Sequence, residues 1–306
     1  MIRQAAFEGK NRMLRTALHV HTTRSDGEGT PAEVLRRYSE CGYDAVALTD
    51  HRRYNFENFA PELELLIIPG MEMDDGFSGP GVHCYHTVVL GHGSENNPYK
   101  QDQTFESGTV TTQENYQKKL DMFHNANQLT MYCHPEWSNT PAREFERLEG
   151  NFGMEIWNSG CVIENGLDVN AACWDELLMQ GKRIFGCATD DGHAMSHHGR
   201  GWVCVNAEKE LDAVLSALER GAFYSSCGPE IKDFYVEDGK AVVECSPCCD
   251  VSFRSDCFPL MRKYDKAGGI VRHETRIPDF LKYVRVTVTD SEGRRAWSNP
   301  IFFDKK

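Results

Sequence analysis

The chain has 306 residues, 40% of them hydrophobic, which is enough for one large α/β domain and a smaller second one. Its formal net charge of −13 disfavours sequence-independent nucleic-acid binding, which requires a surface rich in lysine and arginine. The N-terminal segment with Arg3, Glu8 and Lys10 lacks the apolar core of a signal peptide, and no apolar run has the length of a membrane span. We therefore expect a cytoplasmic protein with no membrane partner. Its twelve cysteines should be thiols, and we interpret the CxxC pair of Cys245 and Cys248 as structural.

The first predicted unit is a strand, a helix and a second strand. Residues 14–21 form an apolar run that ends in polar side chains. Thr30 and Glu33 have capping-box spacing around Pro31, so a helix should begin there. Residues 44–49 are the next apolar run. A crossover of this length is typical of parallel strands.

The pattern then repeats along the chain. Further strands are predicted at residues 65–68, 85–91, 129–133, 153–158, 183–189 and 202–205, and further helices at 112–127, 170–180 and 211–220. This alternation predicts an α/β fold with a parallel sheet curled into a barrel, whose site lies at the C-terminal ends of the strands. After residue 230 the helix patterns stop, and alternating runs such as 283–288 indicate antiparallel strands. We predict a barrel domain over residues 1–230 and a small β-rich extension over 231–306.

Histidines and carboxylates follow these strands. On an extended strand, His19 and His21 point to the same face and can bind one metal ion. The full set of predicted metal ligands is His19, His21, Asp26, His51, Glu72, His86, His134, Asp191 and His193. One catalytic ion needs three or four protein ligands, so nine indicate two or three divalent ions, with Glu72 as a bridge. Mixed imidazole and carboxylate ligands suit Zn, Mn or Fe.

These motifs together resemble the PHP family, named for polymerase and histidinol phosphatase, over about residues 14–230. The resemblance rests on the HxH of His19 and His21, the Thr-Asp-His ending at His51, the Gly-Met-Glu at Glu72, the His-Pro at His134 and the Asp-Gly-His of Asp191 and His193. It implies a distorted (β/α)7, TIM-like barrel with a multinuclear metal centre. Residues 296–301 resemble the end of a subgroup with a β extension, which includes carbamate-cleaving hydrolases.

The resemblance also implies how the ligands are shared. One ion would be held by His19, His21, Glu72 and Asp191, a second by Glu72, His86 and His134, and a third by Asp26, His51 and His193. His86 is preferred over the neighbouring His83 because it directly precedes the apolar run 88–91. In relatives with an empty third site, Asp26 or His193 acts as an acid or a base.

The predicted activity is hydrolysis by a metal-activated water, with a small phosphomonoester or nucleotide as substrate, which is an EC 3.1 phosphoesterase reaction. His51 or His193 is the candidate general acid. Arg200 is the predicted phosphate-binding residue, with Arg24, Arg52 and Arg53 as other candidates. The only partner expected is this small molecule; no stable nucleic-acid partner is expected, and the oligomeric state stays open.

Two other functions remain open at this stage: a metallohydrolase of a carbamate, amide or other non-phosphate ester, and a module that binds metal without catalysis. The roles of two further polar residues also stay open. Glu155 and Asn158, at another strand end, either orient ligand histidines or make structural hydrogen bonds. Trp137 is interpreted as a core residue rather than part of a base-stacking pocket.

Overall fold

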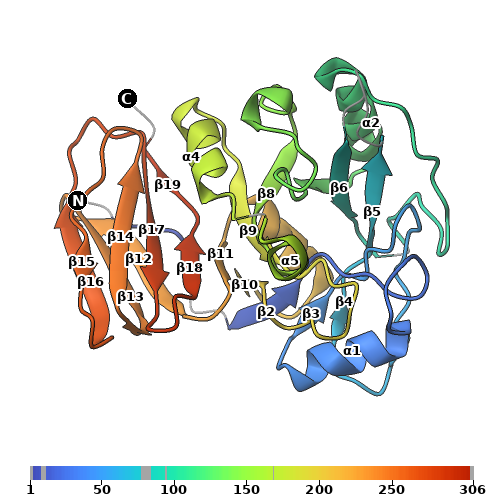
Figure 1. The fold of residues 1–306 in the computed structure, drawn as a ribbon, viewed down its shortest axis with the longest axis horizontal. Coiled ribbons are helices and arrows are strands. Elements are labelled where there is room, and N and C mark those ends of the chain that lie inside the picture. The colour runs from blue at the N-terminus through green and yellow to red at the C-terminus, as the bar shows by residue number, and fades with distance from the viewer. Residues whose placement is uncertain (1–2, 8–11, 77–83, 94, 168, 304–306) are drawn as a thin grey trace.

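The computed structural model describes residues 3–7, 12–76, 84–93, 95–167 and 169–303. These residues form a mixed α/β structure with few helices and many strands, in three sheets. The C-terminal strands stand together on one side of the molecule, away from α1 (Pro31–Glu40) and α2 (Gln113–Asn125) (Figure 1). Among the described residues, no helix has both the length and the apolar character needed to cross a lipid bilayer.

The largest sheet has ten strands and runs through both parts of the chain. Its strands, in spatial order, are β15 (Lys263–Tyr264), β14 (Asp250–Ser255), β17 (Tyr283–Thr289), β18 (Arg295–Ser298), β11 (Phe223–Ser226), β10 (Trp202–Asn206), β2 (Met13–Ala17), β3 (Ala45–Val46) and β4 (Leu66–Ile67), with β19 (Ile301–Phe302) paired to β17. Only β2, β3 and β4 are parallel; the other pairs are antiparallel. The C-terminal strands therefore extend the sheet that begins with β2.

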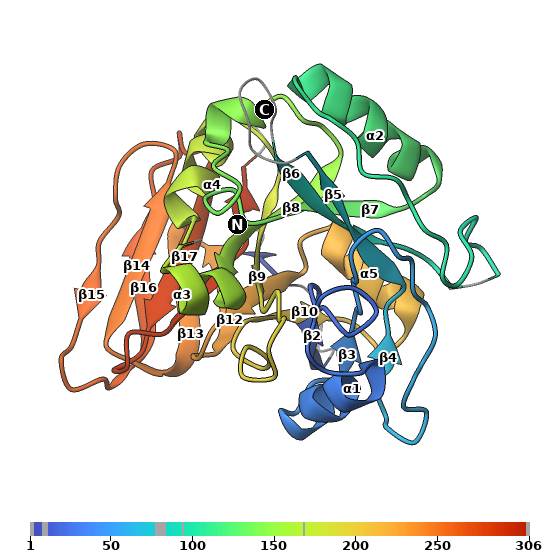
Figure 2. The ribbon, with the colours of Figure 1, turned by 45° about the vertical axis from the view of Figure 1, so that its right-hand side comes forward.

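The second sheet has five strands. They are β5 (Gly70–Asp75), β6 (Tyr85–Leu90), β7 (Leu129–Tyr132), β8 (Asn151–Asn158) and β9 (Phe185–Thr189), in this spatial order. The first three are antiparallel, whereas β7, β8 and β9 are parallel. Figure 2 shows this sheet above the parallel strands β2, β3 and β4.

The third sheet lies in the C-terminal part. It contains β1 (Gln4–Ala5), β12 (Ile231–Glu237), β13 (Lys240–Cys248) and β16 (Ile270–Arg276). The helices are α1 (Pro31–Glu40), α2 (Gln113–Asn125), α3 (Ser159–Asn165), α4 (Ala171–Met179) and α5 (Leu211–Glu219), with the 3-10 turn η1 (Ala142–Glu144). The predicted capping box of α1 is confirmed, because Thr30 accepts from the Glu33 backbone and Glu33 accepts from the Thr30 backbone.

The predicted parallel topology is only partly correct. Only nine residues (76–84) separate β5 from β6, fewer than a parallel crossover requires, and these two strands pair antiparallel. β10 also runs antiparallel to β2 and β11. The described strands form three separate sheets and no closed ladder, so the predicted seven-stranded barrel is not confirmed.

The two larger sheets are nevertheless joined at several points. Single bridges connect Val20 with Gly192 and His51 with Glu72. The free edge of β9 is satisfied by side chains: Ser225 Oγ donates to the Gly186 carbonyl and accepts from the Ala188 backbone. Asn299 Oδ1 accepts from the Gly186 backbone. These contacts cover an edge strand that would otherwise expose unpaired peptide groups.

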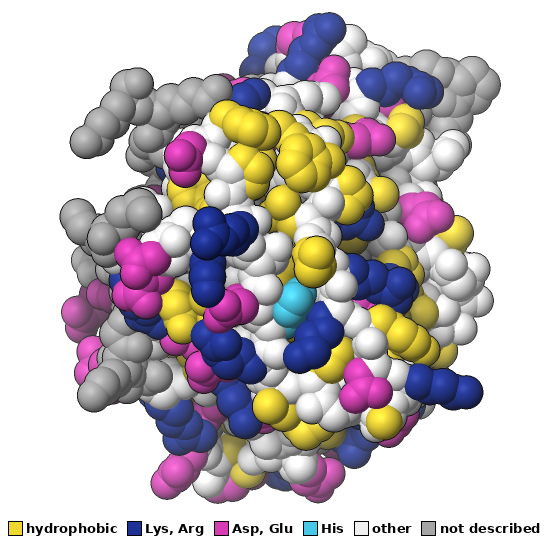
Figure 3. All heavy atoms as spheres, turned by 90° about the vertical axis from the view of Figure 1, so that its left-hand side faces the viewer, with side chains coloured by type: hydrophobic (Ala, Val, Ile, Leu, Met, Phe, Trp, Pro, Cys, Tyr) yellow, Lys and Arg dark blue, Asp and Glu magenta, His cyan; other side chains and the backbone are white. Residues whose placement is uncertain are grey.

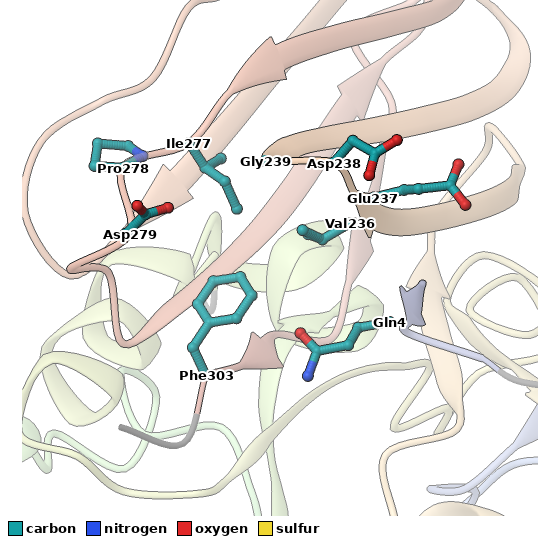
Figure 4. Close-up of a pocket in the computed structure, with 9 residues that line it drawn as sticks. All are labelled: Gln4, Val236, Glu237, Asp238, Gly239, Ile277, Pro278, Asp279 and Phe303. Carbon is teal, nitrogen blue, oxygen red and sulfur yellow. The ribbon is translucent and has the colours of Figure 1, made fainter. Parts of the chain in front are cut away.

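The C-terminal strands surround their own hydrophobic core, centred on residues such as Phe234 and Phe253. Figure 3 shows hydrophobic and charged side chains mixed on the face that this part presents. A cavity of about 370 Å³ lies between the β12–β13 turn and residues 277–279, with Glu237, Asp238 and Asp279 in its wall (Figure 4). None of the predicted ligands lines it.

All twelve cysteines are free thiols, as the sequence predicts. The two members of the CxxC pair, Cys245 and Cys248, are buried on β13 with their sulfur atoms 3.6 Å apart. The buried location agrees with a structural role.

A buried ion pair joins the C-terminal strands to α4. The guanidinium of Arg285, on β17, makes two hydrogen bonds of 2.7 Å to Asp175 and stacks over Trp174. The Arg285 side chain is only 2% exposed, whereas that of Asp175 is 21% exposed. Loss of the carboxylate would leave a buried cation without a partner.

We therefore expect Asp175→Asn to lower the free energy of unfolding by about 3 kcal/mol. Arg36 and Glu62 form a pair in which both side chains are 54% exposed. Arg36→Gln should change the free energy of unfolding by less than about 1 kcal/mol. Urea denaturation of both variants measures the difference, and equal effects would show that Asp175 does not anchor Arg285.

Candidate metal centre

The candidate site is a cavity of about 240 Å³ where the two larger sheets meet. Its lining residues are Asp26, His51, Glu72, His86, His134, Trp137, Gly160, Cys161, Glu164, Asp191 and His193. Glu72 and His86 lie on β5 and β6, and the other predicted ligands lie in the segments that follow β2, β3, β7 and β9. The structure thus brings the nine predicted ligands into one region.

Four buried side chains form an inner cluster. The Nε2 atoms of His19 and His21 lie 3.2 Å apart. Glu72 Oε2 lies 3.3 and 3.2 Å from these nitrogens, and Asp191 Oδ1 lies 3.3 and 3.1 Å from them. Ligand atoms that each lie about 2 Å from one cation have separations of this size. The inner cluster therefore has the dimensions of a site for one cation.

Glu72 extends this cluster towards three further histidines. Its Oε1 lies 2.9 Å from His86 Nδ1 and 3.2 Å from His134 Nε2, while its Oε2 lies 3.0 Å from His51 Nδ1. Both oxygens of one carboxylate therefore face imidazole nitrogens, the arrangement expected of a bridging ligand. His83, the alternative to His86, lies outside the described residues.

An outer, more open cluster surrounds Asp26. Its carboxylate oxygens lie 3.5 Å from His51 Nε2, 3.5 Å from His193 Nε2 and 3.6 Å from His21 Nδ1. The Asp26 side chain is 55% exposed, so this cluster opens to solvent. His21 and His51 lie between the Asp26 cluster and Glu72. In each ring, one nitrogen faces Asp26 and the other faces Glu72. Since a neutral imidazole has only one acceptor nitrogen, each of these rings can bind an ion on one side only.

The residues fit divalent cations, as the hydrogen-bond inventory shows. His51 Nδ1, Glu72 Oε2, Asp74 Oδ1 and Asp191 Oδ1 are buried atoms without a hydrogen-bond partner among the described residues. They lie 3.0–3.3 Å from imidazole nitrogens or carboxylate oxygens of the cluster, but without the geometry of a hydrogen bond. Buried polar atoms without a hydrogen bond are rare in folded proteins. A bound cation would satisfy the three carboxylate oxygens, whereas a hydrogen on His51 Nδ1 would face Glu72 and Asp74.

The electrostatics show how strongly these groups need positive charge. Burial favours the neutral imidazole of His51, but nearby carboxylates, Glu72 foremost, raise its pKa to about 11. Burial opposes the shift at His86 too, whose pKa is raised to about 10, mainly by Glu72. Burial would raise the pKa of Glu72 and Asp191, yet the surrounding imidazoles hold both well below the usual value. Protons or metal cations can supply the charge that these carboxylates require.

Three residues at the site have unusual backbone conformations. His134, Asp191 and Arg52 have φ angles of 22°, 46° and 52°, in the region that favours glycine. Such conformations cost about 1–3 kcal/mol each and persist where the surroundings impose them. They direct ligand side chains into the cavity from the ends of β7 and β9.

Asp74 is a site residue that the sequence interpretation missed. Its Oδ1 lies 3.1 Å from His51 Nδ1, and its Oδ2 accepts a 2.9 Å hydrogen bond from Arg52. The signal was present in the sequence, because Glu72 and Asp74 are two residues apart on β5 and share a face. Asp75 points the other way, to Lys119 and the Gly108 backbone.

Trp137 was also misinterpreted. Its side chain is not in the core: it is 45% exposed and lines the cavity, with its ring 5.0 Å from that of His134. The residue follows His134 in a tight turn rather than in a strand or helix, so no periodic pattern indicates its direction.

The predicted arginines do not line the cavity. Arg200 Nε donates to the Ser196 carbonyl, and Arg24 and Arg53 pair with Asp102. The described lining residues include neither lysine nor arginine. Any charge compensation for an anion must therefore come from bound cations or protonated histidines.

Residues 17–163 match the family model of the PHP domain, and no curated protein sequence matches the chain. This match agrees with the resemblance that the motifs indicate. Among solved structures, a two-domain protein from Bacteroides vulgatus described as containing a predicted PHP-like metal-dependent phosphoesterase is similar, with 15% identity, a TM-score of 0.49 and coverage of 95% of this chain and 99% of that one. An amidohydrolase from Chromobacterium violaceum has 15% identity, a TM-score of 0.40 and coverage of 58% and 87%. Both likenesses are distant.

We expect Asp74→Asn to weaken the binding of an ion held by His51 by about 10-fold or more, because the amide removes the charge beside Nδ1. Asp75→Asn is the matched control, since its carboxylate faces Lys119 instead. Metal content after dialysis against a weak chelator, measured by mass spectrometry, compares the two. Equal metal retention in both variants would exclude a role for Asp74.

Proposed function

We propose that this protein is a metal-dependent hydrolase that cleaves a small phosphomonoester or nucleotide. The observation that carries the proposal is the convergence of imidazoles and carboxylates on Glu72, within or next to a PHP domain. Unpartnered buried donor atoms in the same cluster support resident cations rather than a purely structural network.

The proposed ligand groups follow the clusters. His19, His21, Glu72 and Asp191 would hold one ion; Glu72, His86 and His134 a second; and Asp26, His51 and His193 a third. Divalent Zn, Mn or Fe bound there would lower the pKa of bound water towards about 7 and offset charge on a phosphate oxygen. Glu72 would bridge because both of its oxygens face ring nitrogens.

In this proposal, the groups that transfer protons are the histidines of the solvent-exposed cluster around Asp26. Although burial opposes it, the hydrogen bond with Asp26 and the charge of Asp191 raise the pKa of His193 to about 9. When the third ion site is empty, His193 is protonated at neutral pH and can give a proton to a leaving alkoxide. The Asp26 carboxylate lies 3.5 Å from His193 Nε2. His51 is the alternative proton donor when it binds no ion.

The proposal extends to the architecture. We propose that β2, β3 and β5–β9 make up a distorted seven-stranded barrel, supported by the bridges of Val20 with Gly192 and of His51 with Glu72. Residues 1–230 would carry the catalytic unit and residues 231–306 an extension that supports its β9 edge.

A second candidate is hydrolysis of a carbamate, amide or other non-phosphate ester. It is favoured by the absence of lysine and arginine from the described lining of the cavity. A dianionic phosphate would rely on the cations and on protonated histidines, whereas a neutral substrate needs no such partner. Arg200 stays a prediction for phosphate binding, and would have to leave the Ser196 carbonyl to serve in it.

We expect the protein purified from metal-supplemented medium to contain at least two transition-metal ions per chain. Elemental analysis tests this, and a metal-free protein under these conditions would exclude the proposal. A parallel screen with Mn or Zn should then show turnover of phosphomonoesters or nucleotides. Turnover confined to carbamates or amides would select the second candidate.

His51→Ala and Asp191→Asn should each reduce hydrolysis by at least about 100-fold while the fold is retained, because each removes a donor next to Glu72. His124→Ala is a suitable control, since its ring bonds Thr130 on the far side of β7. Circular dichroism verifies folding, and full turnover in both site variants would show that the ligands are misassigned.

A further inference from the structure

A buried carboxylate outside the predicted ligand set connects three of the ligands. Glu155, on β8, is completely buried and does not line the cavity. We propose that Glu155 is a positioning residue, which fixes His19, His134 and Asp191 in the orientation required to bind metal. The inference rests on the proposed metal centre and adds to it a residue whose role is not coordination.

All four partners of Glu155 are hydrogen-bond donors. Its Oε1 accepts from His19 Nδ1 at 2.7 Å and from Thr189 Oγ1 at 2.6 Å. Its Oε2 accepts from the His134 backbone N–H at 2.8 Å and from Asn158 Nδ2 at 2.9 Å. Both oxygens are thus fully used within the protein, which leaves Glu155 no free lone pair directed at a cation.

The contact with His19 determines which ring nitrogen faces the metal. When Nδ1 carries the hydrogen that Glu155 accepts, the lone pair of a neutral imidazole is on Nε2. Nε2 is the atom that lies among His21, Glu72 and Asp191. The carboxylate therefore holds His19 in the tautomer that can coordinate, and increases its basicity.

The other contacts act on ligands whose backbones are strained. The N–H that Glu155 accepts belongs to His134, whose φ is 22°. Asn158 Nδ2 lies 2.9 Å from Asp191 Oδ2 as well as from Glu155, and Asp191 has a φ of 46°. With Oδ2 held by Asn158, Oδ1 is the oxygen directed into the inner cluster.

A bulge in β8 makes this network possible. In a regular strand, residues three apart point to opposite faces. The pairing of β8 with β9 shifts register between Glu155 and Trp157, and the extra residue lets Glu155 and Asn158 face the same network. An irregularity at the site thereby places two supporting side chains behind ligands from three other strands.

Glu155→Gln tests the proposal with little change in size. The amide has one oxygen and one NH₂ group, and hydrogen-bond donors face both positions. In either orientation of the amide, its N–H groups therefore point at other donors. Near His134 it would oppose a backbone N–H, which cannot reverse. Near His19 it would favour the tautomer with hydrogen on Nε2, the coordinating atom.

We expect Co²⁺ titration of metal-free Glu155→Gln to show at least a 10-fold loss of affinity at the tightest site, with an altered visible absorption band. Asp175→Asn is the control: it should lower stability through Arg285 but leave the Co²⁺ affinity and spectrum unchanged. Circular dichroism establishes that both proteins are folded. A merely structural Glu155 would behave as Asp175 does.

The outcomes separate this inference from the proposed function. If the wild-type protein binds no Co²⁺, both fail. If wild type and Glu155→Gln bind Co²⁺ equally with the same spectrum, only the positioning role is overturned. If Glu155→Gln does not fold, Glu155→Asp is the alternative variant, because it keeps the charge but shortens the side chain. It should bind Co²⁺ more weakly than the wild type. Unchanged Co²⁺ binding would overturn the positioning role.

Discussion

The constraint on which the site depends is the burial of one carboxylate, Glu72, among five imidazole rings. Its side chain is 1% exposed, and its two oxygens lie within 3.3 Å of nitrogens from five histidines: His19, His21, His51, His86 and His134. An isolated buried carboxylate is costly, so in the folded protein either positive charge lies beside it or it binds a proton itself. The inner cluster and the strand ends around it are arranged about this requirement.

Two further carboxylates contact the histidines that surround Glu72. Glu155 supports the ring of His19 from behind, and Asp74 lies against the ring of His51. Each leaves the other ring nitrogen directed to a different neighbour. The geometry of the centre is therefore set by contacts that no ligand motif contains, and these contacts come from β5 and β8 rather than from the loops.

The nine side chains that the sequence indicates lie together in the structure, and they can be recognised because the relevant signals are local. An apolar run followed by histidine or aspartate marks the end of a buried strand, and such ends gather at one edge of a sheet. Asp74 was missed because no strand was predicted over β5, so nothing indicated that it shares a face with Glu72. Glu155 and Asn158 could not be assigned, since a bulge, which no alternation pattern reveals, determines where they point. Arg200 has the right chemistry, but its contact with Ser196 depends on loop geometry.

The fold was less predictable, because strand direction does not follow from local sequence signals. Strand positions and the cap of α1 follow from periodicity and local hydrogen bonds, whereas strand direction depends on whether a helix intervenes. Only the nine residues 76–84 join β5 to β6, too few for a parallel crossover, and the two strands form an antiparallel pair. The short helix α3 was not predicted, because its seven residues contain glycine and follow directly on a strand.

The C-terminal residues 231–306 contact the edge of β9 that has no neighbouring strand among those described. This strand leads into Asp191, so its position controls one wall of the inner cluster. On one side it pairs with β8; on the other, Ser225 and Asn299 replace a neighbouring strand by side-chain hydrogen bonds to Gly186 and Ala188. Asn299 also donates to two carbonyls near β11. Because Asn299 comes from the last part of the chain, the C-terminal strands help to hold β9, and with it Asp191, in place.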